Sequence, residues 1–119
     1  MKIKGKNPAL RGLIEALNTK SIEEDNMFWK SVSLALNRPN RKQFKINLYR
    51  LDRSIKPNET VVIPGTVLGG GEIAKPATIA AYKFSAEAKK KIEKAKGRAI
   101  SIEQLMVLKP DGSGARIIG

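Results

Sequence analysis

Hydrophobic residues near the start of the chain recur at the spacing of one helix face. Asn7 and Pro8 precede them, and this pair is typical of a helix start because Asn caps free amides and Pro fits the first helical position. The pattern predicts a helix over residues 8–19 with an apolar face formed by Leu10, Leu13, Ile14 and Leu17. Residues 1–6 lack such a pattern, so we expect a flexible basic arm ahead of a single domain over residues 7–119.

A further apolar face predicts a second helix over residues 23–37. Ser21 to Glu24 match the capping-box pattern at its start, with Asp25 as a rival cap, and Pro39 prevents the helix from continuing. Trp29 lies in this helix and allows two interpretations. It is either partly buried in the core, or part of an aromatic surface that stacks on a base or a sugar.

From residue 44 onward, helical spacing gives way to short alternating runs separated by turns. β-Branched and apolar runs between Gly or Pro residues predict strands, and longer spacings predict helices. The predicted order is strand 44–48, helical turns 49–55, strand 60–63 closed by Pro64-Gly65, an extended piece 66–68, strand 77–84, a helix from the Ser85 cap to Gly97, strand 99–102, helix 103–108 and strand 116–118.

One part of this pattern occurs twice. Ile46-Asn47-Leu48-x-x-Leu51 matches Ile100-Ser101-Ile102-x-x-Leu105 at an offset of 54 residues, and each copy is followed by a proline turn and a strand ending in Gly. We interpret this as one unit of strand, helical turn, turn and strand used twice; chance similarity between short apolar pieces is the alternative. The alternation of strands and helices indicates an α/β fold.

Composition adds a strong positive charge to this picture. The chain has 119 residues, of which 23 are Lys or Arg and 11 are Asp or Glu, giving a formal net charge of +12 at pH 7. Such a charge on a small domain is typical of nucleic-acid partners, and solubility or heat adaptation is the alternative. The 41% hydrophobic fraction suffices for one core. No run reaches the roughly 18 apolar residues of a membrane span, and the basic stretch lacks the apolar face of a membrane-surface helix.

Most side chains that support catalysis are missing. The chain has no Cys and no His, which excludes disulfides, thiol catalysis, the commonest general base and the commonest metal ligand. Asp25, Asp52 and Asp111 each have a structural explanation, and no Lys-Ser or Lys-Thr follows the glycines at 69–71 as in a phosphate-binding loop. We therefore expect no enzyme activity, cofactor, metal or small-molecule substrate.

Several segments are candidates for nucleic-acid contact because they combine cations with a stiff or unshielded backbone. Pro39 stiffens one basic loop, and three consecutive glycines leave the backbone open to a phosphate or a sugar, with a hairpin or bulge without ligand as the alternative. The candidates are Lys2, Lys4, Lys6, Asn7 and Arg11 at the start, Arg38, Asn40, Arg41 and Lys42 in the loop, Lys45, Arg50 and Arg53 after it, and Gly69, Gly70, Gly71, Lys75, Lys89 and Lys90 in and beyond the glycine loop.

Five segments together carry a family resemblance that extends over nearly the whole chain. They are Asn7-Pro8-x-Leu10, Arg38-Pro39-x-Arg41, Ile46-Asn47-Leu48-x-x-Leu51, Thr60 to Gly71, and Phe84-Ser85-x-x-Ala88-x-x-x-Ile92. With these motifs the chain resembles the ribosomal large-subunit proteins of the archaeal and eukaryotic "eighteen-e" type, which are related to bacterial large-subunit protein fifteen. Its length, without a long extension, is similar to that of the archaeal members.

The resemblance implies irregular strand-strand-helix superhelical turns with mixed short strands, preceded by two N-terminal helices. It implies a cytoplasmic protein of the large subunit that binds large-subunit ribosomal RNA and meets neighbouring ribosomal proteins. The contacts it implies are the Asn7 region, Arg38 to Lys42, Asn47 with Arg50, and Leu68 to Gly71. The alternative function is a free-standing basic RNA- or DNA-binding module, such as an RNA chaperone.

Two positions depart from the family pattern. Thr66 stands where members often carry Lys, which puts one cationic contact in doubt. Lys96 stands where bacterial relatives commonly carry a glycine, and the glycine of this chain is Gly97. This departure predicts that the helix end shifts by one residue.

Overall fold

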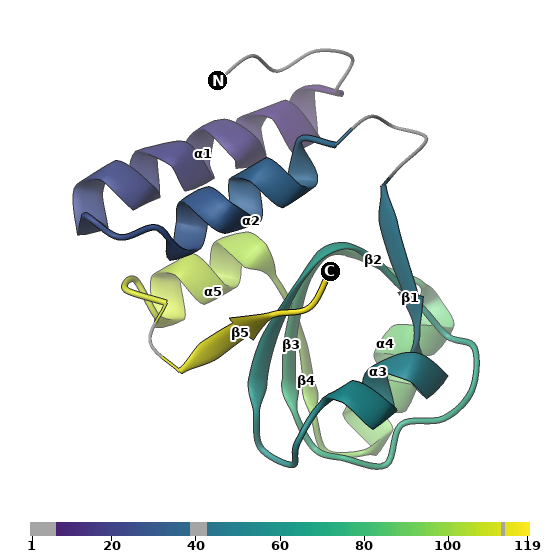
Figure 1. The fold of residues 1–119 in the computed structure, drawn as a ribbon. Helices are drawn as coiled ribbons and strands as arrows, with labels where there is room; N and C mark the ends of the chain where they lie inside the picture. Colours follow the sequence, from purple (N-terminus) through teal and green to yellow (C-terminus); the bar gives the residue numbers. More distant parts are fainter. Residues whose placement is uncertain (1–6, 39–42, 113) are drawn as a thin grey trace.

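The fold comes from a computed structural model, and the structure describes residues 7–38, 43–112 and 114–119 (Figure 1). The helices in these ranges are α1 (Pro8–Glu24), α2 (Phe28–Leu36), α3 (Leu48–Ser54), α4 (Ala86–Lys94) and α5 (Ile102–Leu108). The strands are β1 (Phe44–Asn47), β2 (Thr60–Leu68), β3 (Thr78–Phe84), β4 (Arg98–Ser101) and β5 (Ala115–Ile117). The predicted α/β class, with two helices ahead of short strands and helices, is confirmed.

The strands form one sheet in which the paired strands run parallel. β2 pairs with β3 along one edge, and β4 follows beyond β3. The other edge of β2 is shared, because β5 pairs with residues 60–62 and β1 pairs with residues 65–68. β2 and the first half of β3 are almost entirely buried, which explains why their sequences are nearly continuous apolar runs.

Helices cover both faces of the sheet and create two cores (Figure 1). α1, α2 and α5 pack on one face, where they contact Val62, Ala80 and Ile100. α3 and α4 pack on the other face with Ile63 and Ile79. Because neighbouring residues of a strand point to opposite faces, one apolar run supplies both cores. No helix within the described ranges has the length and apolar character needed to cross a membrane.

The duplicated sequence pattern corresponds to a duplicated structural unit. β1 and α3 have counterparts in β4 and α5 whose bounds lie 54 residues later at every end. A turn and a parallel strand follow each copy, β2 after the first and β5 after the second. The interpretation of one unit used twice is therefore confirmed.

The junction between the first two helices differs from the prediction. α1 continues through residues 20–24, and α2 begins at Phe28 rather than at residue 23. Ser21 is buried and donates its hydroxyl to the carbonyl of Asn26 over 2.8 Å, so the capping box predicted there is wrong. Asp25 instead ends α1 with a left-handed φ of 48°. The helix extends because residues 22–24 propagate a helix more readily than they start one.

β2 continues through Pro64 and Gly65, where the sequence predicts an end. The proline lies at a register shift between Ile63 and Thr66, at the point where pairing changes from β5 to β1. Its missing N–H therefore removes no regular ladder bond. Gly65 is needed because a Cβ there would overlap the carbonyl oxygen of Phe44.

The end of α4 does not shift by one residue, so that prediction is wrong. Lys96 adopts the left-handed conformation with φ 66°. Its amide donates to the carbonyl of Glu93, and the amide of Gly97 donates to the carbonyl of Ile92. These two bonds form the usual left-handed helix end, with Lys in the position that glycine favours. The other predicted boundaries after residue 43 agree within about two residues.

Trp29 is fully buried, so its interpretation as a surface for stacking on a base is wrong. Its indole Nε1 donates to the carbonyl of Pro110 over 2.7 Å, and the ring of Phe28 meets it edge-on at a centroid distance of 4.8 Å. The indole anchors α2 to the turn after α5.

Candidate nucleic-acid interface

Three neighbouring strands end at the same edge of the sheet because they are parallel. β1 ends at Asn47, β2 at Leu68 and β3 at Phe84. α3, the glycine loop of residues 69–71 and α4 follow these ends directly. The carboxyl edge of a parallel sheet is the usual place for a binding site, and here it gathers candidates from three parts of the chain.

The glycine loop is held from within the protein at the Gly70 amide and at all three of its carbonyls. The amide of Gly70 donates to Asn47 Oδ1 over 3.1 Å, and its carbonyl accepts from the Tyr49 amide over 2.9 Å. Lys91 Nζ donates to the carbonyls of Gly69 and Gly71 over 3.0 and 2.7 Å. Gly70 and Gly71 nevertheless remain exposed. The loop is thus a fixed surface element, and its carbonyls do not need a ligand for support.

Lys91 connects α4 to the loop through a small ionic cluster. Its ammonium lies 3.0 Å from the carboxylate of Glu87 and 3.3 Å from that of Glu72. The hydrogen bond with Glu87, assisted by Glu72, raises the pKa of Lys91 above its ordinary value despite partial burial. Its charge is therefore balanced inside the protein, unlike the charges of Lys89 and Lys90 on the same helix.

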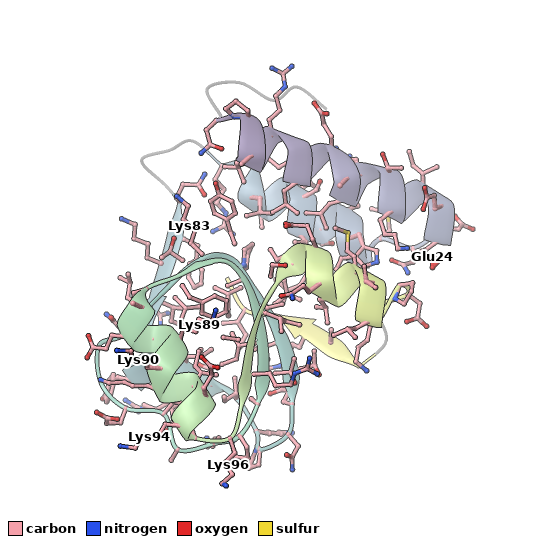
Figure 2. The ribbon with its side chains drawn as sticks, turned by 180° about the vertical axis from the view of Figure 1, so that it is seen from behind. Glu24, Lys83, Lys89, Lys90, Lys94 and Lys96 are labelled. Carbon is pink, nitrogen blue, oxygen red and sulfur yellow. The ribbon has the colours of Figure 1, made fainter. Side chains whose placement is uncertain are left out.

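Exposed cations surround this edge on both helices. Arg50 and Arg53 project from α3, and Lys89 and Lys90 from α4. Figure 2 shows Lys89, Lys90, Lys94 and Lys96 along one side of the molecule with Lys83, whereas Glu24 lies at the opposite end. Glu23 and Asp25 are exposed next to Glu24, so the molecule has a basic side and an acidic end.

A row of side chains crosses the sheet next to the basic side. Lys45 of β1 is in register with Thr66 of β2, and Thr66 is in register with Lys83 of β3. Residues in register on neighbouring strands point to the same face. Thr66 is thus flanked by two exposed lysines. The sequence pattern did not select Lys83, Lys94 or Lys96, because single lysines on short elements carry little pattern.

The first helix begins next to this surface. Asn7 caps α1 by accepting from the Leu10 amide over 2.8 Å, and its Nδ2 donates to the Tyr82 hydroxyl over 3.4 Å. Arg11 is exposed and pairs with Glu15 at 3.3 Å, while the carbonyl of Arg38 accepts from Gln43 over 2.8 Å. The candidates Lys2, Lys4, Lys6, Asn40, Arg41 and Lys42 lie outside the described residues.

Lys75 has a structural function. Its ammonium donates to the carbonyls of Asp52 and Ile55 over 2.6 and 2.9 Å, and so it completes the end of α3. Asp52 in turn accepts from the Ala74 amide over 3.1 Å. The predicted RNA contact at Lys75 therefore competes with two backbone acceptors. Among the described residues, no group of His, Cys, Asp and Glu has the arrangement of a metal site.

Comparison with known proteins gives the family. Residues 2–118 match the family model described as ribosomal protein 60S L18 and 50S L18e. The chain belongs to this family. Relatives named large ribosomal subunit protein eL18 are similar over 112 residues, or 94% of this chain: 42% identical in Archaeoglobus fulgidus (96% of the relative), 40% in Methanoregula boonei (93%) and 39% in Haloarcula marismortui (96%).

Membership in the L18/L18e family confirms the family resemblance that the sequence motifs carried. The family consists of structural proteins of the large ribosomal subunit, not enzymes, and this chain is accordingly a structural component of the cytoplasmic ribosome. The archaeal relatives also agree with its short length.

Proposed function

We propose that the chain binds and stabilises large-subunit ribosomal RNA through its basic side. The observation that carries the proposal is the arrangement at the carboxyl edge of the sheet, where an exposed glycine loop contacts both α3 and α4, and these helices carry the exposed Arg50, Lys89 and Lys90. The acidic end with Glu24 lies away from this side (Figure 2). Neighbouring large-subunit proteins are further proposed partners, over surface that the RNA leaves uncovered.

The mechanism follows from rigidity and charge. Exposed arginines and lysines neutralise crowded phosphates and release their counterions. Because Lys91 and Asn47 already hold the glycine loop, little entropy is lost when RNA backbone approaches it. The protein therefore recognises the shape of a folded RNA junction and reads few bases.

The test compares charge variants in binding to a large-subunit ribosomal RNA transcript. The variant R50Q/K89Q/K90Q should bind more weakly by several kcal/mol, since charge-assisted hydrogen bonds contribute about 1.5–3 kcal/mol each. The slope of log K against log salt should fall by roughly one for each phosphate that is no longer neutralised. The matched control K20Q/K109Q removes two cations elsewhere and should keep nearly full affinity. Equal losses of binding free energy per removed charge in the two variants would show that only net charge matters and would reject the proposed side.

Co-sedimentation separates the proposal from the alternative of a free-standing RNA- or DNA-binding module. The protein should remain with large subunits through a moderate-salt wash. Release into the supernatant, together with equal affinity for unrelated RNA, would favour the module.

A further inference from the structure

Tyr49 differs from every other aromatic residue of the chain in its exposure. Its side chain is 60% exposed, whereas Phe28, Phe44, Tyr82 and Phe84 are half-buried and Trp29 is fully buried. The ring therefore contributes little to either hydrophobic core. An exposed large aromatic on a cationic surface is a recurrent means of binding unpaired bases.

The backbone and Cβ of Tyr49 are fixed although its ring is exposed. Its amide donates to the carbonyl of Gly70 over 2.9 Å. Its Cβ lies so close to Gly71 that a Cβ added to the glycine would be only 2.5 Å away. The packing thus uses the first atoms of the side chain and leaves the ring to the solvent.

Arg53 orients the ring from one turn further along α3. Its guanidinium carbon lies 5.5 Å from the ring centroid, and Nη1 donates to the Tyr49 hydroxyl over 2.9 Å. Arg50 is exposed on the same short helix. An aromatic face beside one guanidinium group, on a helix that carries a second exposed arginine, combines a surface for a base with donors for the adjoining phosphates.

We propose that Tyr49, oriented by Arg53, is a stacking subsite for one unpaired nucleobase of the bound RNA. This inference rests on the proposed function and adds a base contact to a surface otherwise devoted to phosphates. A nucleobase is favoured over an apolar protein segment because the Arg53 guanidinium lies at the ring, exposed Gly71 lies beside the Tyr49 Cβ, and neither apolar core of the described residues includes Tyr49. A crosslink from Tyr49 to a protein would indicate the alternative, a contact with an apolar protein segment.

Affinity for the large-subunit RNA transcript is measured for Y49L, Y49F and the control V107A, which truncates an exposed apolar residue of α5. Y49L should bind about tenfold more weakly, as expected for one stacked base. Because no charge is removed, its salt slope should equal that of the unchanged chain, whereas R50Q should lower the slope by roughly one. Y49F retains the ring and should bind within about threefold. All four variants keep the Cβ, and thermal melting checks that they fold.

Ultraviolet crosslinking of intact large subunits provides the second readout. A nucleotide adduct on the peptide containing Tyr49 is expected, and it should disappear in Y49L. Unchanged affinity of Y49L, or a crosslink from this position to a protein, would overturn the stacking subsite while leaving the charge-based proposal intact. Failure of the unchanged chain to bind the RNA would instead reject the proposed function.

Discussion

The three loop glycines are required for different reasons. A Cβ at Gly69 would lie 2.8 Å from that of Glu87 on α4. At Gly70 the nearest atoms belong to the side chain of Asn47, with Oδ1 2.5 Å away. Gly71 has φ 81° and a Cβ there would approach the backbone of Tyr49. Gly70 is thus the position at which a side chain disturbs the fold least and the exposed surface most.

Substitution of Gly71 by Ala should therefore cost more stability than substitution of Gly70 by Ala. G71A combines a left-handed φ with a backbone clash and should lose about 1–3 kcal/mol in the free energy of unfolding. G70A displaces one side chain and its hydrogen bond and should lose about 1 kcal/mol. Urea titration measures both. The affinity of G70A for the RNA should fall by more than its small loss of stability accounts for. A larger loss of unfolding free energy for G70A than for G71A would contradict this assignment.

Lys96 offers a stabilising substitution, because its left-handed φ of 66° is one that glycine adopts without strain. K96G should raise the free energy of unfolding by about 1 kcal/mol. The corresponding increase in melting temperature is roughly 4 °C. The control K90G places glycine in the interior of α4 and should destabilise by about 1 kcal/mol. A fall in melting temperature for K96G would show that its side chain stabilises the helix end.

At the scale of single residues, the sequence predicts the local structure correctly where a residue type fits only one backbone geometry. Asn7 and Ser85 cap α1 and α4 as predicted. It misled where the same residues fit two geometries: Ser21 has the pattern of a cap but lies inside α1, and the true capping box at Ser101 and Gln104 was not predicted. The inward roles of Lys75 and Lys91 depend on carbonyls twenty or more residues away, which local pattern does not show.

Among the elements, Arg116 of β5 is joined by an ion pair to the residue before β2 and by a hydrogen bond to the end of α3. Arg116 donates to both carboxylate oxygens of Glu59, over 2.7 and 3.0 Å, and to the carbonyl of Ser54 over 2.6 Å. The hydrogen bonds from Arg116, assisted by the Lys56 amide, lower the pKa of Glu59 from 4.5 to about 2. The pair connects segments 57 residues apart.

This ion pair predicts a specific acid sensitivity. Because the folded-state pKa of Glu59 lies below its ordinary value, the stabilisation is complete above about pH 4.5 and is lost as the pH falls toward 2. The change should be about 1 kcal/mol, since the pair is partly solvated. Urea unfolding of the native chain and E59Q at pH 6 and pH 3 measures it. The two stability curves should converge on acidification; parallel curves would contradict the role of Glu59.

Element type was largely predictable because each short element has its own spacing and turn. β2 was the exception, since Pro64 and Gly65 resemble an end until the partner strands are known. The carboxyl-edge site was only partly predictable. The duplicated sequence pattern indicated which strands and helices correspond to each other. The hydrogen bond between Asn47 and Gly70, however, depends on the parallel register of β1 and β2, which the pattern does not give.

For the whole molecule, β5 completes the shared edge of β2. Removal of residues 115–119 should lower the free energy of unfolding by at least about 3 kcal/mol, because it removes ladder hydrogen bonds, half-buried Ile117 and the Arg116 pair. R116Q keeps the strand and should lose only about 1 kcal/mol. Thermal and urea unfolding compare the two variants. Equal destabilisation would show that the ion pair, and not the strand, accounts for the effect.

The separation of charge along the molecule has a kinetic consequence. A body with lysines along one side and Glu24 at its far end, as in Figure 2, turns in the field of a polyanion before contact. Encounters that would begin with the Glu24 end are less strongly attracted, so collisions start more often from a nearly correct orientation. Assembly should consequently proceed quickly at low ionic strength and slow down steeply as added salt shortens the reach of that field.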